Sequence, residues 1–206
     1  MAKISELITR TQYLIDKNLD AQKIIDLFNE CLEDLGNVVV VAKTKTYQAS
    51  SGTTTFTIPN DVIEIARVSV TVDGKIYDLS LRPLRKDYYP QDDSLSYSLF
   101  GDQLTLQKGM KQDFQLSVDY FGSPQRIPSL TEDPSLSTEP NFPPRYHRVL
   151  PLFSAIRYYE NWEGGQDQRM TYLNEYEGIK KEMSYDSQRM LRRTRPNTVQ
   201  IYRGWQ

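Results

Sequence analysis

The feature that most constrains the fold is a change in hydrophobic period near residue 38. Before this point apolar residues recur every three or four positions, as on one face of a helix. After it, runs of β-branched and aromatic residues are separated by turn-forming residues, and the helical period returns at residue 145. Helices at both ends with strands between them predict an α+β fold, in which the terminal helices form one bundle and a β domain is inserted.

Two helices are expected in residues 1–37. Ser5 is available to cap the first helix, and Asp20 is available to cap the second. The single cysteine, Cys31, lies on the apolar stripe of the second helix, so we interpret it as a small buried hydrophobic residue. Across the whole bundle, the residues expected to be buried are Ile24, Leu27, Phe28, Leu35, Leu150, Phe153, Ile156, Leu173 and Tyr176.

Residues 38–121 are expected to form an antiparallel β domain. Two joints between strand-like runs, Asp73-Gly74 and Gly101-Asp102, are two-residue turns that contain glycine, which is a strong hairpin signal. Short strands at this spacing predict a small antiparallel sandwich or barrel.

A proline-rich stretch, residues 122–144, follows the β domain and has almost no periodicity, so it is expected to be an extended crossing loop. Residues 145–185 then show the pattern of a helix pair. Pro151 lies inside the first helical pattern, where it removes a backbone donor, so that helix is expected to bend there or to begin anew.

The last segment, residues 186–206, is expected to be an extended C-terminal arm. It is rich in arginine, with Asp186 as its one acid, and it has too few regularly spaced apolar residues to build a core. Arginine and aromatic residues are enriched at interface anchors, so we interpret the arm as a segment that orders on a partner. A frayed, solvated tail is the alternative. The candidate docking residues are Arg189, Arg192, Arg193, Arg195, Tyr202, Arg203 and Trp205.

Catalytic signatures are missing from the sequence. The single histidine, His147, allows neither a Ser-His-Asp triad nor a multi-histidine metal site by itself, and is expected to be a capping or surface residue. Asp92-Asp93 and Glu132-Asp133 lie in loop-like stretches, where solvated carboxylates are the default. No glycine-rich phosphate loop follows a strand. The sequence therefore predicts no enzyme, no cofactor and no metal.

Charge and hydropathy restrict the partners further. The net charge of −2 disfavours general nucleic-acid binding, which depends on clustered positive charge. No apolar run is long enough to span a membrane, and the N-terminus has no apolar segment typical of a signal peptide. We therefore expect no membrane partner and folding in a cytoplasm.

Several phrases of the sequence resemble the head-to-tail connector, or adaptor, proteins of tailed bacteriophages. The resemblance covers most of residues 5–185, and it is carried by FTIPNDVIEIARV (56–68), LFGDQLTL (99–106), LSVDYF (116–121) and FPPRYHRVL (142–150). It implies a virion protein that forms a ring, commonly of twelve subunits, under the portal vertex. Such a ring extends the channel through which double-stranded DNA passes without sequence-specific binding. It also presents a platform for tail proteins, and a C-terminal segment docks on the portal.

The resemblance adds an expectation for other parts of the chain, namely that the loop 122–144 and the β domain contact neighbouring subunits or tail proteins. Two alternative functions remain open. The chain could be another tail or baseplate component, which would need no portal-binding arm. It could also be a carbohydrate- or protein-binding β module, an interpretation favoured by Tyr88, Tyr89 and Tyr97.

Overall fold

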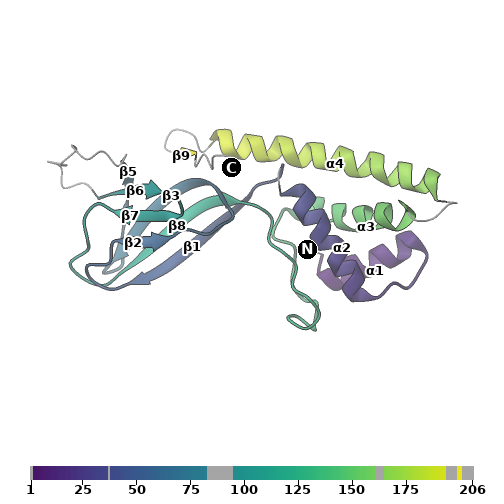
Figure 1. The fold of residues 1–206 in the computed structure, drawn as a ribbon, viewed down its shortest axis with the longest axis horizontal. Coiled ribbons are helices and arrows are strands. Elements are labelled where there is room, and N and C mark those ends of the chain that lie inside the picture. Colours follow the sequence, from purple (N-terminus) through teal and green to yellow (C-terminus); the bar gives the residue numbers. More distant parts are fainter. Residues whose placement is uncertain (1, 37, 83–94, 161–164, 194–198, 201–206) are drawn as a thin grey trace. The chain divides into compact units, whose positions relative to one another are not determined.

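The computed structural model describes residues 2–36, 38–82, 95–160, 165–193 and 199–200 (Figure 1). The chain divides into two compact units. Met1–Val41 with Ser123–Met190 form the helical unit, and Ala42–Gly122 with Leu191–Gln206 form the β unit. Helices and antiparallel sheets are both present, which confirms the predicted α+β class. Among the described residues, no helix is both long and apolar enough to cross a membrane.

The first two helices, α1 (Ile4–Ile15) and α2 (Ala21–Leu35), begin in different ways. Asp20 caps α2 as predicted, because its side chain accepts from the backbone N–H groups of Gln22 (2.9 Å) and Lys23 (3.3 Å). Ser5 does not cap α1, which already begins at Ile4. The carbonyl groups of Thr138 and Leu136 instead accept from the N–H groups of Ile4 and Ser5, so the loop after the β unit supplies this cap.

Pro151 marks the start of a helix and not a kink within one. A short 3₁₀ helix, η1 (Pro144–Tyr146), precedes α3 (Val149–Glu160), and Pro151 lies in the first turn of α3. Backbone N–H groups in the first turn have no intrahelical acceptor, so proline costs nothing in hydrogen bonding there. The prediction that a helix begins anew at this point is therefore confirmed. The last helix, α4, runs over Gln166–Arg193.

The core of the helical unit is formed by all four helices. Seven of the nine residues predicted to be buried are buried, whereas Leu27 and Leu173 are only partly buried. Ile25 was not predicted, yet it is fully buried. The core face of α2 is therefore rotated from the predicted one, toward Ile25 and away from Leu27.

The loop that follows Gly122 is packed onto the helical unit. Ile127 and Phe142 are buried in the helical core. The side-chain amide of Asn29 donates to the Ile127 carbonyl (3.1 Å) and accepts from the Ile127 N–H (2.8 Å). The prolines of the loop interrupt regular structure, as predicted. The loop is bonded to α1 and α2 of the same chain, so these contacts need no neighbouring subunit.

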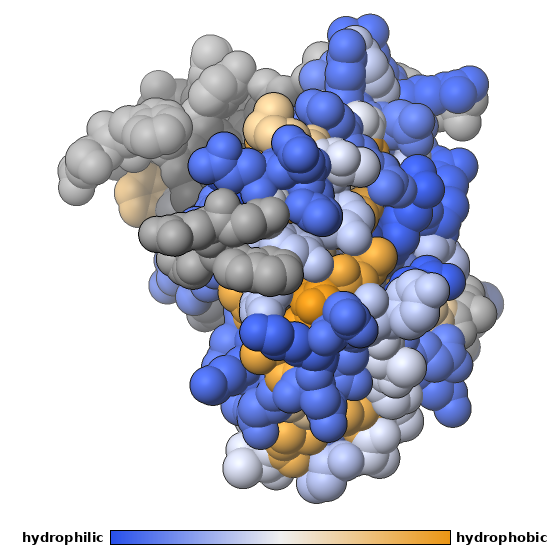
Figure 2. Space-filling model, turned by 90° about the vertical axis from the view of Figure 1, so that its right-hand side faces the viewer, coloured by the Kyte–Doolittle hydropathy of each residue, from blue (hydrophilic) through white to orange (hydrophobic). Residues whose placement is uncertain are grey.

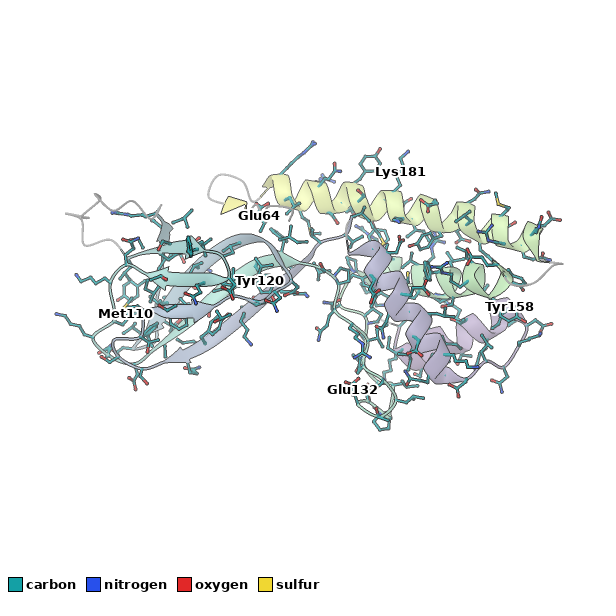
Figure 3. The ribbon with its side chains drawn as sticks, viewed as in Figure 1. Glu64, Met110, Tyr120, Glu132, Tyr158 and Lys181 are labelled. Carbon is teal, nitrogen blue, oxygen red and sulfur yellow. The ribbon has the colours of Figure 1, made fainter. Side chains whose placement is uncertain are left out.

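Glu132, which is labelled in Figure 3, and Asp133 organise the turn of this loop. Glu132 accepts from the backbone N–H of Ser129 at 2.7 Å, and Asp133 accepts from the Thr138 N–H at 3.2 Å. The hydroxyl groups of Ser135 and Thr138 also donate to Asp133, and they lower the pKa of that carboxyl to about 2. These carboxylates therefore fix loop structure, in keeping with the noncatalytic interpretation.

The β unit contains two sheets. In one, the strand order is β1-β8-β3-β4, with β9 also paired to β3, and in the other it is β2-β7-β6-β5. The strands are β1 (Val41–Ala49), β2 (Thr55–Thr57), β3 (Val62–Val72), β4 (Lys75–Asp78), β5 (Ser80–Leu81), β6 (Ser96–Phe100), β7 (Gln103–Leu106), β8 (Phe114–Gly122) and β9 (Val199–Gln200). One pair, β5 with β6, is parallel, which departs from the purely antiparallel expectation.

The two sheets share one core, as expected for a sandwich. Val68 and Leu116 from the first sheet join Phe56 and Leu104 from the second in a single buried cluster. Both predicted hairpins are present, with Val72 paired to Lys75 and Phe100 paired to Gln103. The glycine in each turn has positive φ, 74° at Gly74 and 60° at Gly101, a conformation that glycine adopts at little cost.

Candidate functional site

The predicted C-terminal arm begins as a helix. Residues 186–193 continue α4, so the prediction of an extended segment from residue 186 is wrong for this part. Of the seven candidate docking residues, Arg189 and Arg192 are exposed on α4, and Arg193 is its last residue. Arg195, Tyr202, Arg203 and Trp205 lie outside the described residues.

The helix continues because its inner face remains occupied. Tyr176, Ile179, Met183 and Ser187 follow one another at helical spacing and are all buried. Ser187 accepts a 3.0 Å hydrogen bond from the backbone N–H of Val40, which supplies an acceptor to a buried donor. The sequence did not predict this extension, because Ser187 is polar and does not continue the apolar face formed by Tyr176, Ile179 and Met183.

Asp186 anchors the same part of α4 to residues just before α3. The Tyr146 hydroxyl donates to Asp186 at 2.6 Å, and Arg145 forms an ion pair with the same carboxylate. Tyr146 and Arg145 hold the pKa of Asp186 below its usual range, although desolvation acts in the opposite direction. The one acid of the predicted arm therefore has a structural role in the helical unit.

A second polar cluster connects the middle of α4 to α2 by hydrogen bonds. Lys180 donates to Asp34 at 2.7 Å, and the Tyr176 hydroxyl donates to the same carboxylate. Burial by itself would raise the pKa of Asp34, but these two hydrogen bonds outweigh it and lower the pKa. Burial raises the pKa of the Cys31 thiol, so the thiol stays protonated, as expected for a structural cysteine.

The outer face of α4 is an exposed stripe. Asn174, Gly178, Lys181, Tyr185, Arg189 and Arg192 follow one another at intervals of three or four residues, and all are exposed. We call these residues the α4 stripe. It lies on the opposite side of the helix from Tyr176, Ile179 and Met183, and Lys181 projects from it away from the other helices (Figure 3). Its largest exposed side chain, Tyr185, is 61% exposed.

A groove of about 550 Å³ lies on the same unit, between α2 and the end of α3. Its lining combines the apolar Leu19 and Leu27 with Tyr158 and with charged side chains from both helices. The charged residues are Lys23, Asp26, Glu30, Arg157 and Glu160. We call this the α2–α3 groove. On the face shown in Figure 2, hydrophobic surface likewise lies among hydrophilic side chains.

The charged wall of the α2–α3 groove is held in place by ion pairs. Arg157 pairs with Glu30 of α2 and, at 3.0 Å, with Glu160 of its own helix. Arg169 of α4 also reaches Glu160 at 3.0 Å. Asp26 is exposed, and its carboxylate accepts a hydrogen bond from the side-chain amide of Gln22, the one side-chain partner it has within the described residues.

The C-terminal strand β9 pairs with β3. Glu64 lies opposite Gln200, and Ile65 lies opposite Val199. Glu64 is 1% exposed, and its Oε1 has no hydrogen-bond partner among the described residues. β3 is irregular here, with register shifts against β8 between Val62 and Glu64 and between Ile65 and Arg67. This pairing could not be predicted from the sequence, because residues 199–200 are too few to show a period.

Two further residues considered in the sequence analysis, His147 and Tyr97, are buried. His147 is buried and not at the surface, with its Nε2 2.8 Å from the Phe142 carbonyl oxygen. Tyr97 is buried in the sandwich core, so it cannot contribute to an exposed aromatic groove. Tyr88, Tyr89, Asp92 and Asp93 lie outside the described residues. Within the described ranges, no three His, Cys, Asp or Glu side chains are grouped so as to hold a metal ion.

The family of the chain is decided by a match that spans both units. The model of the SU10 adaptor protein family matches residues 2–200. The chain belongs to the SU10 adaptor protein family. No curated protein matches the chain significantly. The SU10 adaptor family agrees with the resemblance to phage head-to-tail adaptors, and membership identifies the chain as a structural component of a phage virion. A structural adaptor family implies a protein without catalytic activity, which oligomerises and interacts with portal or tail components.

Proposed function

We propose that the chain forms a head-to-tail adaptor ring, of twelve subunits, in the neck between capsid and tail. The ring docks on the portal, extends the DNA channel and provides the platform on which the tail attaches. The observation that carries this proposal is the SU10 adaptor family match over residues 2–200, which includes the helical unit, the β unit and the start of the C-terminal segment.

The C-terminal segment is the proposed portal-docking element. Arg189 and Arg192 are exposed at the end of α4, where their guanidinium groups are available to carboxylates of a partner. Arg193, Arg195 and Arg203 continue the positive charge along the sequence, and Tyr202 and Trp205 supply aromatic anchors. Repetition around a ring multiplies a weak contact by avidity, so each segment needs only modest affinity.

Charge also supports a passive role toward DNA. Acidic side chains outnumber basic ones in residues 1–37, and the whole chain carries a net charge of −2. A surface without clustered positive charge binds phosphates weakly, so DNA slides past it without sequence-specific contacts. Subunits of this kind are made in the host cytoplasm and remain in the virion.

Attachment to DNA-filled heads tests the docking role directly. A chain that lacks residues 194–206 retains the whole of α4 and should fold, yet it should fail to join heads. The double variant Arg189→Glu and Arg192→Glu should join more weakly, with a loss that becomes larger at low salt, because reversed charges repel the acidic partner most where screening is least.

Arg10→Glu on α1 is the matched control, since Arg10 is an exposed arginine outside the C-terminal segment. This control should join heads normally. If both the truncated chain and the double variant joined heads as well as the full chain, portal docking by this segment would be refuted, and another tail or baseplate component would become the better interpretation.

A further inference from the structure

Tyr185 is an exposed aromatic side chain set between two cations. Lys181 and Arg189 lie one helical turn before and after it, on the same face of α4. The Lys181 Nζ is 6.0 Å from the centroid of the Tyr185 ring. Tyrosine and arginine are among the residue types that contribute most binding energy at protein interfaces.

The α2–α3 groove has the complementary character. Leu19 and Leu27 supply apolar surface, and Leu27 is only partly buried within its own subunit. Three carboxylates, Asp26, Glu30 and Glu160, outnumber the two cations at the groove. Arg157 is already neutralised by Glu30 and Glu160, so the exposed carboxylate of Asp26 is the one best placed to meet an incoming cation.

The α4 stripe and the α2–α3 groove of one subunit cannot contact each other. α4 packs on α2 and α3 through its inner face, where Tyr176 contacts Phe153 and bonds to Asp34. The α4 stripe points away from that face, so Tyr185 cannot enter the groove of its own chain. A contact between two different surfaces of identical subunits is heterologous, and it propagates from copy to copy until a ring closes.

Gly178 supplies an independent observation on the same stripe. It lies inside a 28-residue helix, where glycine costs about 1 kcal/mol relative to alanine. A Cβ added at Gly178 would meet nothing within 4 Å, so no contact inside the subunit requires glycine. It lies two turns before Tyr185 on the same line, where a missing side chain lets the backbone of a neighbour approach.

We infer that Gly178, Lys181 and Tyr185 of the α4 stripe pack into the α2–α3 groove of the next subunit, with Tyr185 against Leu27 and with Lys181 facing Asp26. This contact leaves Arg189 and Arg192, farther along the helix, to the portal. The inference rests on the proposed ring and assigns its subunit contact. The occupant of the groove is a second copy of this chain.

Engineered disulfides test the contact in assembled particles. Leu27→Cys and Tyr185→Cys in one chain should give, on oxidation, a ladder of covalent species from dimer up to the full ring, because each subunit then links to two neighbours. Cys31 is fully buried and should not take part. Tyr13→Cys with Leu27→Cys is the matched control, since Tyr13 is 85% exposed on α1, and it should give no ladder.

Charge reversal provides a second test that needs no cysteine. Lys181→Glu and Asp26→Lys should each weaken subunit association several-fold, and the two together should restore it, as measured by native mass spectrometry. Tyr185→Ala should weaken association by about thirtyfold, the loss typical of removing an interface anchor, whereas Tyr13→Ala should not.

The outcomes separate the contact from the function. Dimers without higher species from Tyr185→Cys alone would mean a two-fold contact and would overturn the inference. Particles that contain the double-cysteine chain but show no ladder would also overturn it, while the proposed adaptor function would stand. If the unmodified chain were missing from heads and tails, the proposed function itself would fail.

Discussion

Ser187 of α4 accepts a 3.0 Å hydrogen bond from the backbone N–H of Val40, at the end of the N-terminal part of the helical unit. The bond joins residues 147 positions apart in sequence. Together with the contacts of Asp186, it makes residues 186–187 part of the folded body. The folded part of the chain therefore extends at least to Ser187, and the proposed docking residues, from Arg189 on, follow it.

Asp186→Asn should loosen this end of α4, because the amide keeps the size of the carboxylate but loses the charge that pairs with Arg145. Hydrogen exchange of the backbone amides of residues 183–190 should become faster. Asp167→Asn, at the exposed start of the same helix, should leave exchange in 183–190 unchanged. Equal protection in both variants would contradict an anchoring role for Asp186.

The Tyr176–Asp34–Lys180 cluster should make the free energy of unfolding depend on pH in the acidic range. The pKa of Asp34 is lower in the folded chain than its ordinary value of 3.8, so its contribution is complete above that value. The contribution should be lost as the pH falls through the lower, folded pKa. Asp34→Asn should flatten this part of the curve of unfolding free energy against pH.

Tyr176→Phe removes only the hydroxyl that donates to Asp34, and should cost about 1 kcal/mol at neutral pH. Urea denaturation measures the cost. Tyr172→Phe, on the same helix, serves for comparison, because its hydroxyl has a longer bond, 3.4 Å, to the Leu14 carbonyl. A larger loss of unfolding free energy from Tyr172→Phe would show that the hydrogen bond from Tyr176 to Asp34 contributes less to stability than the one from Tyr172 to Leu14.

Ile25 and Leu27 should respond very differently to truncation. Ile25→Ala empties a fully buried site and should lower the free energy of unfolding by about 2 to 5 kcal/mol. Leu27→Ala removes a partly buried side chain and should cost less than about 1.5 kcal/mol. Urea unfolding followed by circular dichroism compares the two, and a larger loss from Leu27→Ala would mean that α2 faces its core as the sequence predicted.

Gly178 and Gly74 should give opposite results on replacement by alanine. Gly178→Ala relieves the helix of a flexible residue and should stabilise the helical unit by about 0.5 to 1 kcal/mol. Gly74→Ala places a side chain at φ 74° and should destabilise the β unit by more than that. Differential scanning calorimetry of both variants checks the two signs.

Local features of the fold were predictable and contacts between distant segments were not. The Asp20 cap, the Asp73-Gly74 and Gly101-Asp102 turns and the new start at Pro151 depend on a few neighbouring residues, so the sequence carries them directly. The choice between Ile25 and Leu27 depends on how α2 packs against α3, which comes more than a hundred residues later. The parallel pairing of β5 with β6 is likewise set by the sandwich as a whole.

The same difference between local features and contacts of distant segments applies to the candidate site. The exposure of Arg189 and Arg192 could be predicted from the sequence, because charged arginine side chains are seldom buried. Their place on a continuous helix could not, since Val40, Arg145 and Tyr146 hold that helix from other parts of the chain. The α2–α3 groove was not predicted at all, because its walls come from two helices far apart in sequence.

Because Ala42–Gly122 separates the two parts of the helical unit, synthesis imposes an order on folding. α1 and α2 leave the ribosome on the order of ten seconds before α3, at usual rates of translation. During this time Ile25 and Phe28 have no α3 or α4 to cover them, whereas all strands up to β8 are already available to pair. The helical unit closes only when α4 emerges. A chain that ends before α4 lacks the α4 stripe, so under the inferred contact it cannot complete a ring, and unfinished chains are left out of the assembly.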